Sequence, residues 1–389
     1  MSAYFQMGHD SENLVGAVDL EEFAGAILSP VNRAPHELRS FIPKARQAGV
    51  KDIILDPQFY FPRSARGKLG QHAYFPTDFD TTDYSSDSWW SDVVGKLVTE
   101  GKELTVDAIA TPVICPRLWD DKYWTRCINT FFQLEGNLGG KKIRPVFTAF
   151  VNINSLHNPN EVFRLASIIS ESSAKDFLLI LVTEIEPRRE IIDDGGLSGF
   201  MHLIHLLAQT GAVTVSYTCS DLILYKAAGA ANCATGKFFN LRRFTSSRFD
   251  DSEQAGGQIP YWFEPNLLGF LREADVLRLK RLQLDSMFAD TGTASIWTAH
   301  IEQNLAQSPP EPWLRESWRQ YLSSFGKIEK NVTGVQDIPT VAGWLKDSEA
   351  RWKQLDERGI IMDEERNDGR WLRPWRQALQ EFRLRIGAT

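Results

Sequence analysis

The stretch from Ile143 to Glu184 contains IRPVFTAFV (143–151), then PNEVFRLASIISESS (159–173), then FLLILVTE (177–184). The first and third segments are short apolar runs, whereas the segment between them has apolar residues at helical spacing. Strands that are apolar along their whole length are typical of parallel sheets, because both faces of such sheets are covered. The stretch therefore predicts a strand, a helix and a second strand parallel to the first.

The same alternation extends over the first three quarters of the chain. The predicted strands are Phe23–Pro30, Lys51–Asp56, Val106–Ile114, Ile143–Val151, Phe177–Glu184, Ala212–Tyr217, Ala231–Phe239 and Ile259–Phe263. The predicted helices are Pro35–Ala48, Ser86–Glu100, Asp120–Leu138, Pro159–Ser173, Leu197–Gln209, Ser220–Ala228 and Asn266–Leu284. The short run Tyr4–Met7 is a further strand candidate, which either plugs the end of the barrel or joins its sheet.

This order of elements predicts an α/β fold, a (β/α)8 barrel of the TIM type. A doubly wound open α/β sheet is the alternative. The two folds differ in whether Ala231–Phe239 and Ile259–Phe263 are both strands that close the ring.

The strand pattern stops at about Ser295. Seven of the twelve tryptophans lie in the helical stretches that follow: Trp297, Trp313, Trp318, Trp344, Trp352, Trp371 and Trp375. Large aromatic side chains dominate both protein cores and protein interfaces. The tail therefore predicts helices that pack on the barrel or bind a partner subunit. The predicted domains are a barrel over residues 1–294 and a helical C-terminal extension over residues 295–389.

The composition excludes several classes of protein. No run approaches the roughly 18 apolar residues of a membrane span, and a formal net charge of −7 argues against general coating of DNA. The N-terminus lacks the segments of a secretory signal, so we predict a cytoplasmic protein. The four cysteines form no C-x-x-C pair and the histidines form no H-x-x-x-H set. We therefore predict no disulfide framework, no metal site and no cofactor.

Acidic residues at strand ends are the predicted catalytic groups, because barrels of this class bind their substrates where the strands end. Asp56 closes one predicted strand, and its alternative role is to cap a turn. Glu184 and Glu186 follow another strand, with one residue between them, and therefore share a face of an extended segment. Carboxylates that repel each other can divide into an acid and a base. Arg188 and Arg189 follow at once and could instead neutralise them.

The stretch Leu222–Phe249 contains no acidic residue but carries five cations. Small residues precede the central cations, and their backbone N–H groups can approach a phosphate. The loops after the seventh and eighth strands are the usual phosphate-binding place in these barrels. The predicted phosphate-binding residues are Asn232, Thr235, Gly236, Lys237, Arg242 and Arg243. We expect them to open onto the same mouth as the carboxylates, and a solvated basic surface is the alternative.

Polar residues near other strand ends are predicted to contact the ligand. They are His9, Asp10, Gln58, Tyr60, Arg117, Asn152 and Tyr217. The loop over residues 57–85 exceeds the length of about 12 to 15 residues that is ordinary for a connection. It is rich in aromatic residues, which predicts a lid or a platform on which a base stacks. Plain cover for the barrel mouth is the alternative.

The pair Leu55-Asp56 before Phe59, with the strand–helix order over about residues 1–290, resembles the tRNA-guanine transglycosylase superfamily of (β/α)8 barrels. That superfamily includes relatives that modify DNA bases. Its D-S-G-G-F-Q segment reads Asp56-Pro-Gln-Phe-Tyr in this sequence, and its cysteine-rich zinc cluster is absent. The resemblance implies that Asp56 contacts a base or acts as an acid or base. The resemblance assigns no catalytic nucleophile in this sequence.

Together these features predict a barrel enzyme of the glycosyltransferase or glycosidase type. It would bind a phosphate-bearing, nucleotide-like or nucleic-acid-like substrate and use strand-end carboxylates for glycosyl transfer or hydrolysis. The predicted partners are a phosphorylated or nucleotide-like ligand, single-stranded or modified nucleic acid, and a protein bound through the tryptophan-rich helices, with no membrane. One alternative is a lyase or aldolase on a small phosphorylated metabolite, with Lys237 as the amine nucleophile. Another is a non-catalytic barrel that serves as a scaffold or recognition subunit of a multiprotein complex.

Overall fold

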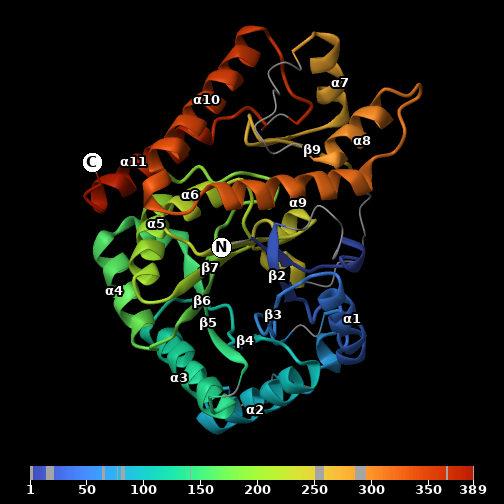
Figure 1. Cartoon of the computed structure of the whole chain (residues 1–389). Helices are drawn as coiled ribbons and strands as arrows, with labels where there is room; N and C mark the ends of the chain where they lie inside the picture. Colours follow the sequence, from blue (N-terminus) through green and yellow to red (C-terminus); the bar gives the residue numbers. More distant parts are fainter. Residues whose placement is uncertain are drawn as a thin grey trace.

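Eight parallel strands close into a barrel in the computed structural model of the chain (Figure 1). The structure describes residues 3–14, 22–63, 66–76, 78–79, 84–140, 142–249, 258–284, 295–364 and 367–388. The barrel strands are β1 (Ala3–Gln6), β2 (Phe23–Leu28), β3 (Asp52–Leu55), β4 (Ala108–Ala110), β5 (Arg144–Asn152), β6 (Asp176–Val182), β7 (Ala212–Ser216) and β8 (Asn232–Thr235). The predicted (β/α)8 barrel is confirmed, and the open sheet is excluded because β1 pairs with both β2 and β8.

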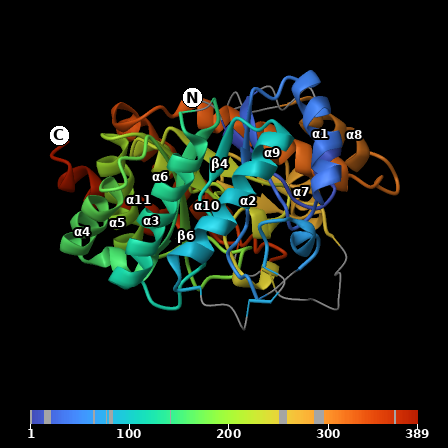
Figure 2. The same ribbon diagram turned by 90° about the horizontal axis from the view of Figure 1, so that it is seen from below.

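Helices between the strands form the outer wall of the barrel (Figure 2). They are α1 (Pro35–Gln47), α2 (Asp87–Leu104), α3 (Asp121–Leu138), α4 (Pro159–Ser170), α5 (Asp194–Ala208) and α6 (Leu222–Ala227). Asp120, Asn158 and Asp193 precede α3, α4 and α5, and each side chain accepts a hydrogen bond from a backbone N–H of the first turn. These caps satisfy donors that a helix leaves free at its start, and thus set where each helix begins.

The interior of the barrel is filled by one tyrosine and by small or branched apolar side chains of the strands. They are Tyr4, Ile27, Ile54, Ala108, Ala110, Val146, Leu178 and Ala234. At the end where the strands begin, the Tyr4 hydroxyl and the Arg144 guanidinium both donate to the carboxylate of Asp52. This polar cluster joins β1, β3 and β5 on the face of the barrel opposite the strand ends.

The predicted closing strand Ile259–Phe263 is wrong. Residues Trp262–Glu264 form β9, which pairs antiparallel with β10 (Gly269–Leu271) in a separate hairpin. The N-terminal run joins the barrel instead, as β1. The predicted helix Asn266–Leu284 is likewise shorter and forms α7 (Glu273–Arg281). A distant residue holds the hairpin, since the Gln320 side chain accepts from the backbone N–H of Phe263 and donates to its carbonyl.

Four helices follow: α8 (Ile296–Leu305), α9 (Leu314–Asn331), α10 (Ile338–Glu357) and α11 (Leu372–Arg385). Helix α9 crosses the barrel beside β1, β8 and α6, whereas α11 lies against α5 (Figure 1). The indole N–H groups of Trp344, Trp352 and Trp375 donate to backbone carbonyls of residues 265, 267 and 191. These tryptophans thus pack on the rest of the chain. The division at residues 294 and 295 stays a prediction, although β9 contacts α9 across it.

Candidate functional site

The carboxyl ends of four strands meet in a buried polar network. Gln6 ends β1, whereas Ser29, Asp56 and Tyr217 come directly after β2, β3 and β7. Each of these four side chains is almost fully buried. The side-chain carbonyl of Gln6 accepts from the Ser216 hydroxyl and from the Tyr217 backbone N–H, both at 3.2 Å. This end of a (β/α)8 barrel carries the active site in characterised enzymes, so the network lies where a functional site is expected.

Asp56 lies at the centre of this network. The Tyr60 hydroxyl donates to one carboxylate oxygen at 2.6 Å, and the backbone N–H of Gln58 donates to the other at 3.0 Å. Burial raises the pKa of Asp56 to about 6, against the opposing effects of these two hydrogen bonds and of Arg248. Burial also raises the pKa of Tyr60 well above its usual value. Tyr60 therefore keeps its proton and Asp56 takes up a proton more readily than an exposed aspartate.

Arg248 reaches this network from the segment after β8. Its guanidinium donates to the Tyr217 hydroxyl and to the Ser29 hydroxyl, both at 3.1 Å. Ser29 in turn donates to the side-chain carbonyl of Gln58 at 3.0 Å. The Gln58 side chain therefore stabilises the turn after β3. Burial raises the pKa of Tyr217 to about 12. Arg248 belongs to the basic stretch, but the sequence did not single it out as a site residue.

Aromatic rings cover the centre of the barrel mouth. Phe244 and Phe249 pack on the Tyr60 ring, with centroids 5.9 and 5.4 Å apart. Phe244 also contacts the rings of Phe150 and Tyr217. Asp56 thus lies beneath these rings and is not among the residues that line the main cavity.

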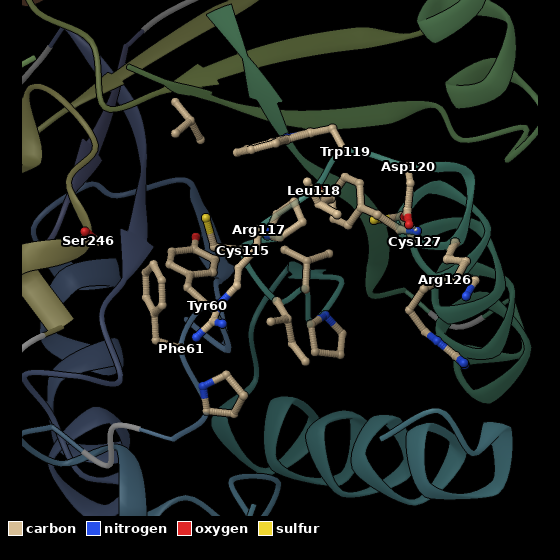
Figure 3. Close-up of a pocket in the computed structure, with 18 of the residues that line it drawn as sticks. Tyr60, Phe61, Cys115, Arg117, Leu118, Trp119, Asp120, Arg126, Cys127 and Ser246 are labelled. Carbon is tan, nitrogen blue, oxygen red and sulfur yellow. Dashed lines mark hydrogen bonds between the residues drawn. The ribbon is translucent and has the colours of Figure 1, made fainter. Parts of the chain in front are cut away.

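The main cavity lies beside this cover, among the loops after β3, β4, β6 and β8 (Figure 3). It has a volume of about 1370 Å³. Its wall combines Tyr60 and Phe61, residues 112–123 after β4, residues 182–187 after β6, and residues 244–246 after β8. Tyr60 links the two parts of the site, because its ring lines the cavity and its hydroxyl binds Asp56.

Most charged side chains in the cavity wall are paired with protein groups. Glu186 lies 3.4 Å from Arg189, whereas Asp121 and Arg126 pair with Arg164 and Asp87 outside the wall. Three others, Arg117, Lys122 and Glu184, make no ion pair or side-chain hydrogen bond within the part of the chain that the structure describes. The wall therefore offers one unpaired carboxylate and two unpaired cations.

The predicted phosphate-binding residues lie outside the lining of this cavity. The Lys237 ammonium donates to the backbone carbonyl of Asp10 at 3.0 Å and sits over the Phe238 and Trp318 rings. Burial lowers the pKa of Lys237 to about 8. Arg242 donates to the carbonyls of residues 236 and 237 and lies 3.6 Å from the centroid of the Tyr321 ring.

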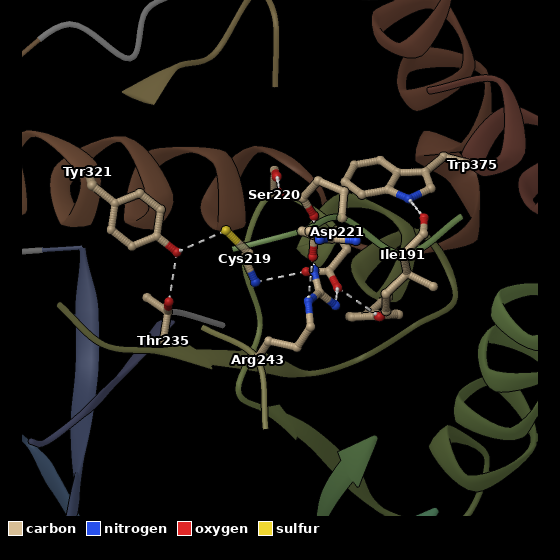
Figure 4. A network of polar contacts seen from close by, with 11 residues as sticks. Ile191, Cys219, Ser220, Asp221, Thr235, Arg243, Tyr321 and Trp375 are labelled. Atoms are coloured by element: carbon tan, nitrogen blue, oxygen red, sulfur yellow. Dashed lines mark hydrogen bonds and ion pairs between the residues drawn. The ribbon is translucent and has the colours of Figure 1, made fainter. Parts of the chain in front are cut away.

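Arg243 belongs to a second buried network (Figure 4). Its guanidinium lies 2.9 Å from Glu190 and 3.4 Å from Asp221, and it also donates to the Arg189 carbonyl. Burial raises the pKa of Glu190 to about 7, although Arg243 opposes that shift. The expectation that carboxylates and cations open onto one mouth was therefore wrong for Lys237, Arg242 and Arg243, since their side-chain donors bond to protein groups elsewhere. Their binding of phosphate stays a prediction.

The remaining predicted residues are scattered over the barrel. Thr235 shares a hydrogen bond with the Tyr321 hydroxyl at 2.7 Å, and a side chain at Gly236 would collide with the Gln6 carbonyl and Leu241. Asn232 begins β8 and so lies at the opposite end of the barrel from the mouth.

His9 and Asp10 are exposed, with their side chains 3.3 Å apart. The Asn152 side chain accepts from the backbone N–H of Asn154 and caps a short turn. Arg117 is in the cavity wall, as a ligand contact would be.

Three residues that sequence reasoning did not select also belong to the site. They are Arg248, Thr183 and Trp119, and the last two lie in the cavity wall. The Thr183 hydroxyl is buried there with no partner in the described chain. Thr183 precedes the predicted Glu184, so its place at a strand end was a usable signal. Nothing local distinguishes Trp119 from the other tryptophans.

No protein-family model matches the sequence, and no curated protein matches it. The resemblance to tRNA-guanine transglycosylases therefore stays a prediction. Among solved structures, an L-ribulose 3-epimerase is similar with a TM-score of 0.35 and 11% identity, over 66% of this chain and 88% of the epimerase. An O-GlcNAc hydrolase mutant from Thermobaculum terrenum has a TM-score of 0.41 and 11% identity, over 100% of this chain and 96% of the hydrolase. Similarity at this level carries no argument about activity.

Within the residues that the structure describes, no group of three or more His, Cys, Asp and Glu side chains is arranged to hold a metal ion. None of the helices that these residues form is both long enough and apolar enough to span a membrane.

Proposed function

We propose that the chain is an enzyme that transfers or hydrolyses the glycosyl group of a nucleotide-like substrate bound in the main cavity. The observation that carries this proposal is the unpaired carboxylate of Glu184 in the cavity wall. Glu184 follows β6, at the strand end where a reacting group of a barrel enzyme belongs. The aromatic rings of the same wall suit the flat faces of a base or sugar.

Glu184 acts as the general base in this proposal. Its negative charge stabilises the oxocarbenium-like transition state as the glycosidic bond breaks and the leaving group departs with the bonding electron pair, to be protonated by solvent. Its carboxylate takes the proton of the attacking water or acceptor hydroxyl as that oxygen bonds to the anomeric carbon. Glu186 is less suited to this role because Arg189 lies 3.4 Å from its carboxylate.

Asp56 acts through Tyr60. The carboxylate is buried and holds the Tyr60 hydroxyl at 2.6 Å, so it fixes the ring that lines the cavity. Asp56 is therefore a positioning residue in this proposal, and the base-contacting role that the family resemblance implies would require the Tyr60 ring to move.

The test compares two neighbouring variants. The purified chain is incubated with nucleosides, nucleotides, short single-stranded oligonucleotides and aryl glycosides, and released base or sugar is followed by liquid chromatography. On the substrate that is turned over, Glu184→Gln should lower kcat/KM by about 100-fold or more, the usual contribution of acid–base catalysis. Glu186→Gln should change it by less than about threefold, because that carboxylate is already paired with arginine.

The proposal would be contradicted by equal effects of the two substitutions, or by absence of turnover across the whole panel. The other two functions stay predictions. A lyase with a Lys237 Schiff base requires substrate to reach an ammonium that is bonded to Asp10 and outside the cavity lining, and borohydride trapping tests it. The scaffold role predicts full biological activity in Glu184→Gln.

A further inference from the structure

The loop after β4, residues 111–120, is held rigidly in the cavity wall. Pro112 and Pro116 restrict its backbone. The backbone N–H of Cys115 donates to the Tyr60 carbonyl at 2.9 Å, and the Trp119 indole N–H donates to the Phe150 carbonyl at 3.0 Å. These bonds anchor the loop to the segment after β3 and to β5. The backbone of the loop and the Trp119 ring are therefore positioned before any ligand arrives, which lowers the entropic cost of binding.

Trp119 is the aromatic residue of the wall best placed to stack on a ligand. Phe61 is stacked on Phe244, with an angle of 12° between the rings, and Phe79 is stacked on Tyr84 at 18°. Within the described residues Trp119 takes part in no ring–ring or cation–ring contact, and it is half-buried in the cavity wall. Its position is fixed through the indole N–H, which leaves the ring as a platform.

Arg117 is two residues before Trp119 and presents an unpaired charge. Its guanidinium has no partner in the described chain, whereas Arg126 in the same wall is bound to Asp87 at 2.5 Å and lies over the Trp90 ring. Figure 3 shows Arg117 in the same part of the cavity as Tyr60 and Phe61. A guanidinium binds phosphate and carboxylate through paired hydrogen bonds.

We infer that the loop over residues 111–120 recognises an anionic ligand with a planar ring, of the nucleoside monophosphate class. The ring stacks on Trp119 and the phosphate binds Arg117. The inference rests on the proposed function only in placing the ligand in the cavity that contains Glu184. The anion site assigned in this way lies in the loop after β4, whereas the sequence predicted it in the segment after β8.

Equilibrium binding tests this assignment without turnover. The full chain carrying Glu184→Gln is titrated by calorimetry with AMP, GMP, CMP and UMP, with the four nucleosides, and with inorganic phosphate. At least one nucleotide should bind about tenfold or more tightly than its nucleoside, as expected for one added charge-assisted pair. Inorganic phosphate alone should bind more weakly than that nucleotide, because it lacks the ring.

Three further substitutions assign the contacts. Arg117→Ala should remove the difference between nucleotide and nucleoside, and Trp119→Ala should weaken both about tenfold, within the range of one base–aromatic stack. Arg373→Ala removes an exposed arginine on α11, outside the cavity wall, and should leave all affinities unchanged.

The inference is overturned if no nucleotide binds, or if binding is unchanged in Arg117→Ala. It is also overturned if only oligonucleotides bind and mononucleotides do not. These results leave the role of Glu184 open to its own kinetic test, since that test reports on the reaction and this one on binding.

Discussion

Asp56 shows how one residue combines opposing physical effects. Burial disfavours its charged form, while Tyr60, Gln58 and Arg248 favour it, and the result is a pKa of about 6 against an ordinary value of 3.8. Folding therefore places a carboxyl group that titrates near neutral pH directly behind the ring of Tyr60. The interaction with Arg248 depends on a segment that is almost two hundred residues away in the sequence.

A pH-dependent stability follows from this shift. Between about pH 4 and 6 the folded chain retains a proton on Asp56 that the unfolded chain has lost, so this group's contribution to stability falls as pH rises through that window. Asparagine does not titrate, so Asp56→Asn lacks this loss of stability. The free energy of unfolding of Asp56→Asn, relative to that of the wild type, should therefore rise by on the order of 2 kcal/mol from pH 4 to pH 7.

Urea denaturation followed by tryptophan fluorescence measures that difference at each pH. Asp92→Asn, which removes an exposed aspartate on α2, serves as the control for the change of charge. A difference that stays flat for Asp56→Asn over this range would show that the carboxyl group is not perturbed by burial.

At the scale of elements, a buried ion pair joins α6 to α9. The Lys226 ammonium lies 3.0 Å from the Glu329 carboxylate and also donates to the Ala231 carbonyl, and both charged side chains are completely buried. The pair therefore depends on both charges being present, because a single buried charge would remain without compensation.

Lys226→Met should destabilise the chain by about 3–5 kcal/mol, the cost of breaking a buried pair from one side. The double variant Lys226→Met with Glu329→Leu should recover most of that loss, since it removes both charges. Chemical denaturation of the two variants and the wild type checks this. Equal stability of the single and double variants would contradict the prediction, because it would show that Glu329 left without Lys226 carries no cost.

At the scale of the whole molecule, the C-terminal helices complete the barrel. Helix α9 lies against β1 and β8, with the Phe325 ring stacked on Phe23 of β2 at 6.3 Å. It occupies the place beside the last strand that the closing helix of a (β/α)8 barrel normally takes. Figure 1 also shows β9 and α7 grouped with α8 and α10 on one side of the barrel.

A truncated chain of residues 1–294 should therefore fail to fold as a cooperative unit. Removal of α9 uncovers the outer side of β1 and β8, leaves Lys226 buried without its partner, and exposes apolar area that favours aggregation. Size-exclusion chromatography and thermal unfolding of the fragment beside the full chain check the prediction. A monomeric fragment with a sharp transition would instead support the division at residues 294 and 295.

The sequence by itself determined the barrel class and most of its elements. Runs such as Phe177–Glu184 are apolar along their length, and such local patterns report which faces are buried whatever the partner. It also placed Asp56 and Glu184 at strand ends, since the end of an apolar run is a local property.

Only the tertiary structure decided how the ring closes and which polar groups share a site. Strand β1 closes the ring by pairing with β2 and β8, whereas Phe263 lies in a separate hairpin whose backbone binds the Gln320 side chain, a contact 57 residues apart in the chain. The cations after β8 likewise found partners in Glu190, Asp221 and the Asp10 carbonyl. A charge in a sequence shows what a residue can bind, whereas its partner depends on which distant groups folding brings within hydrogen-bond distance.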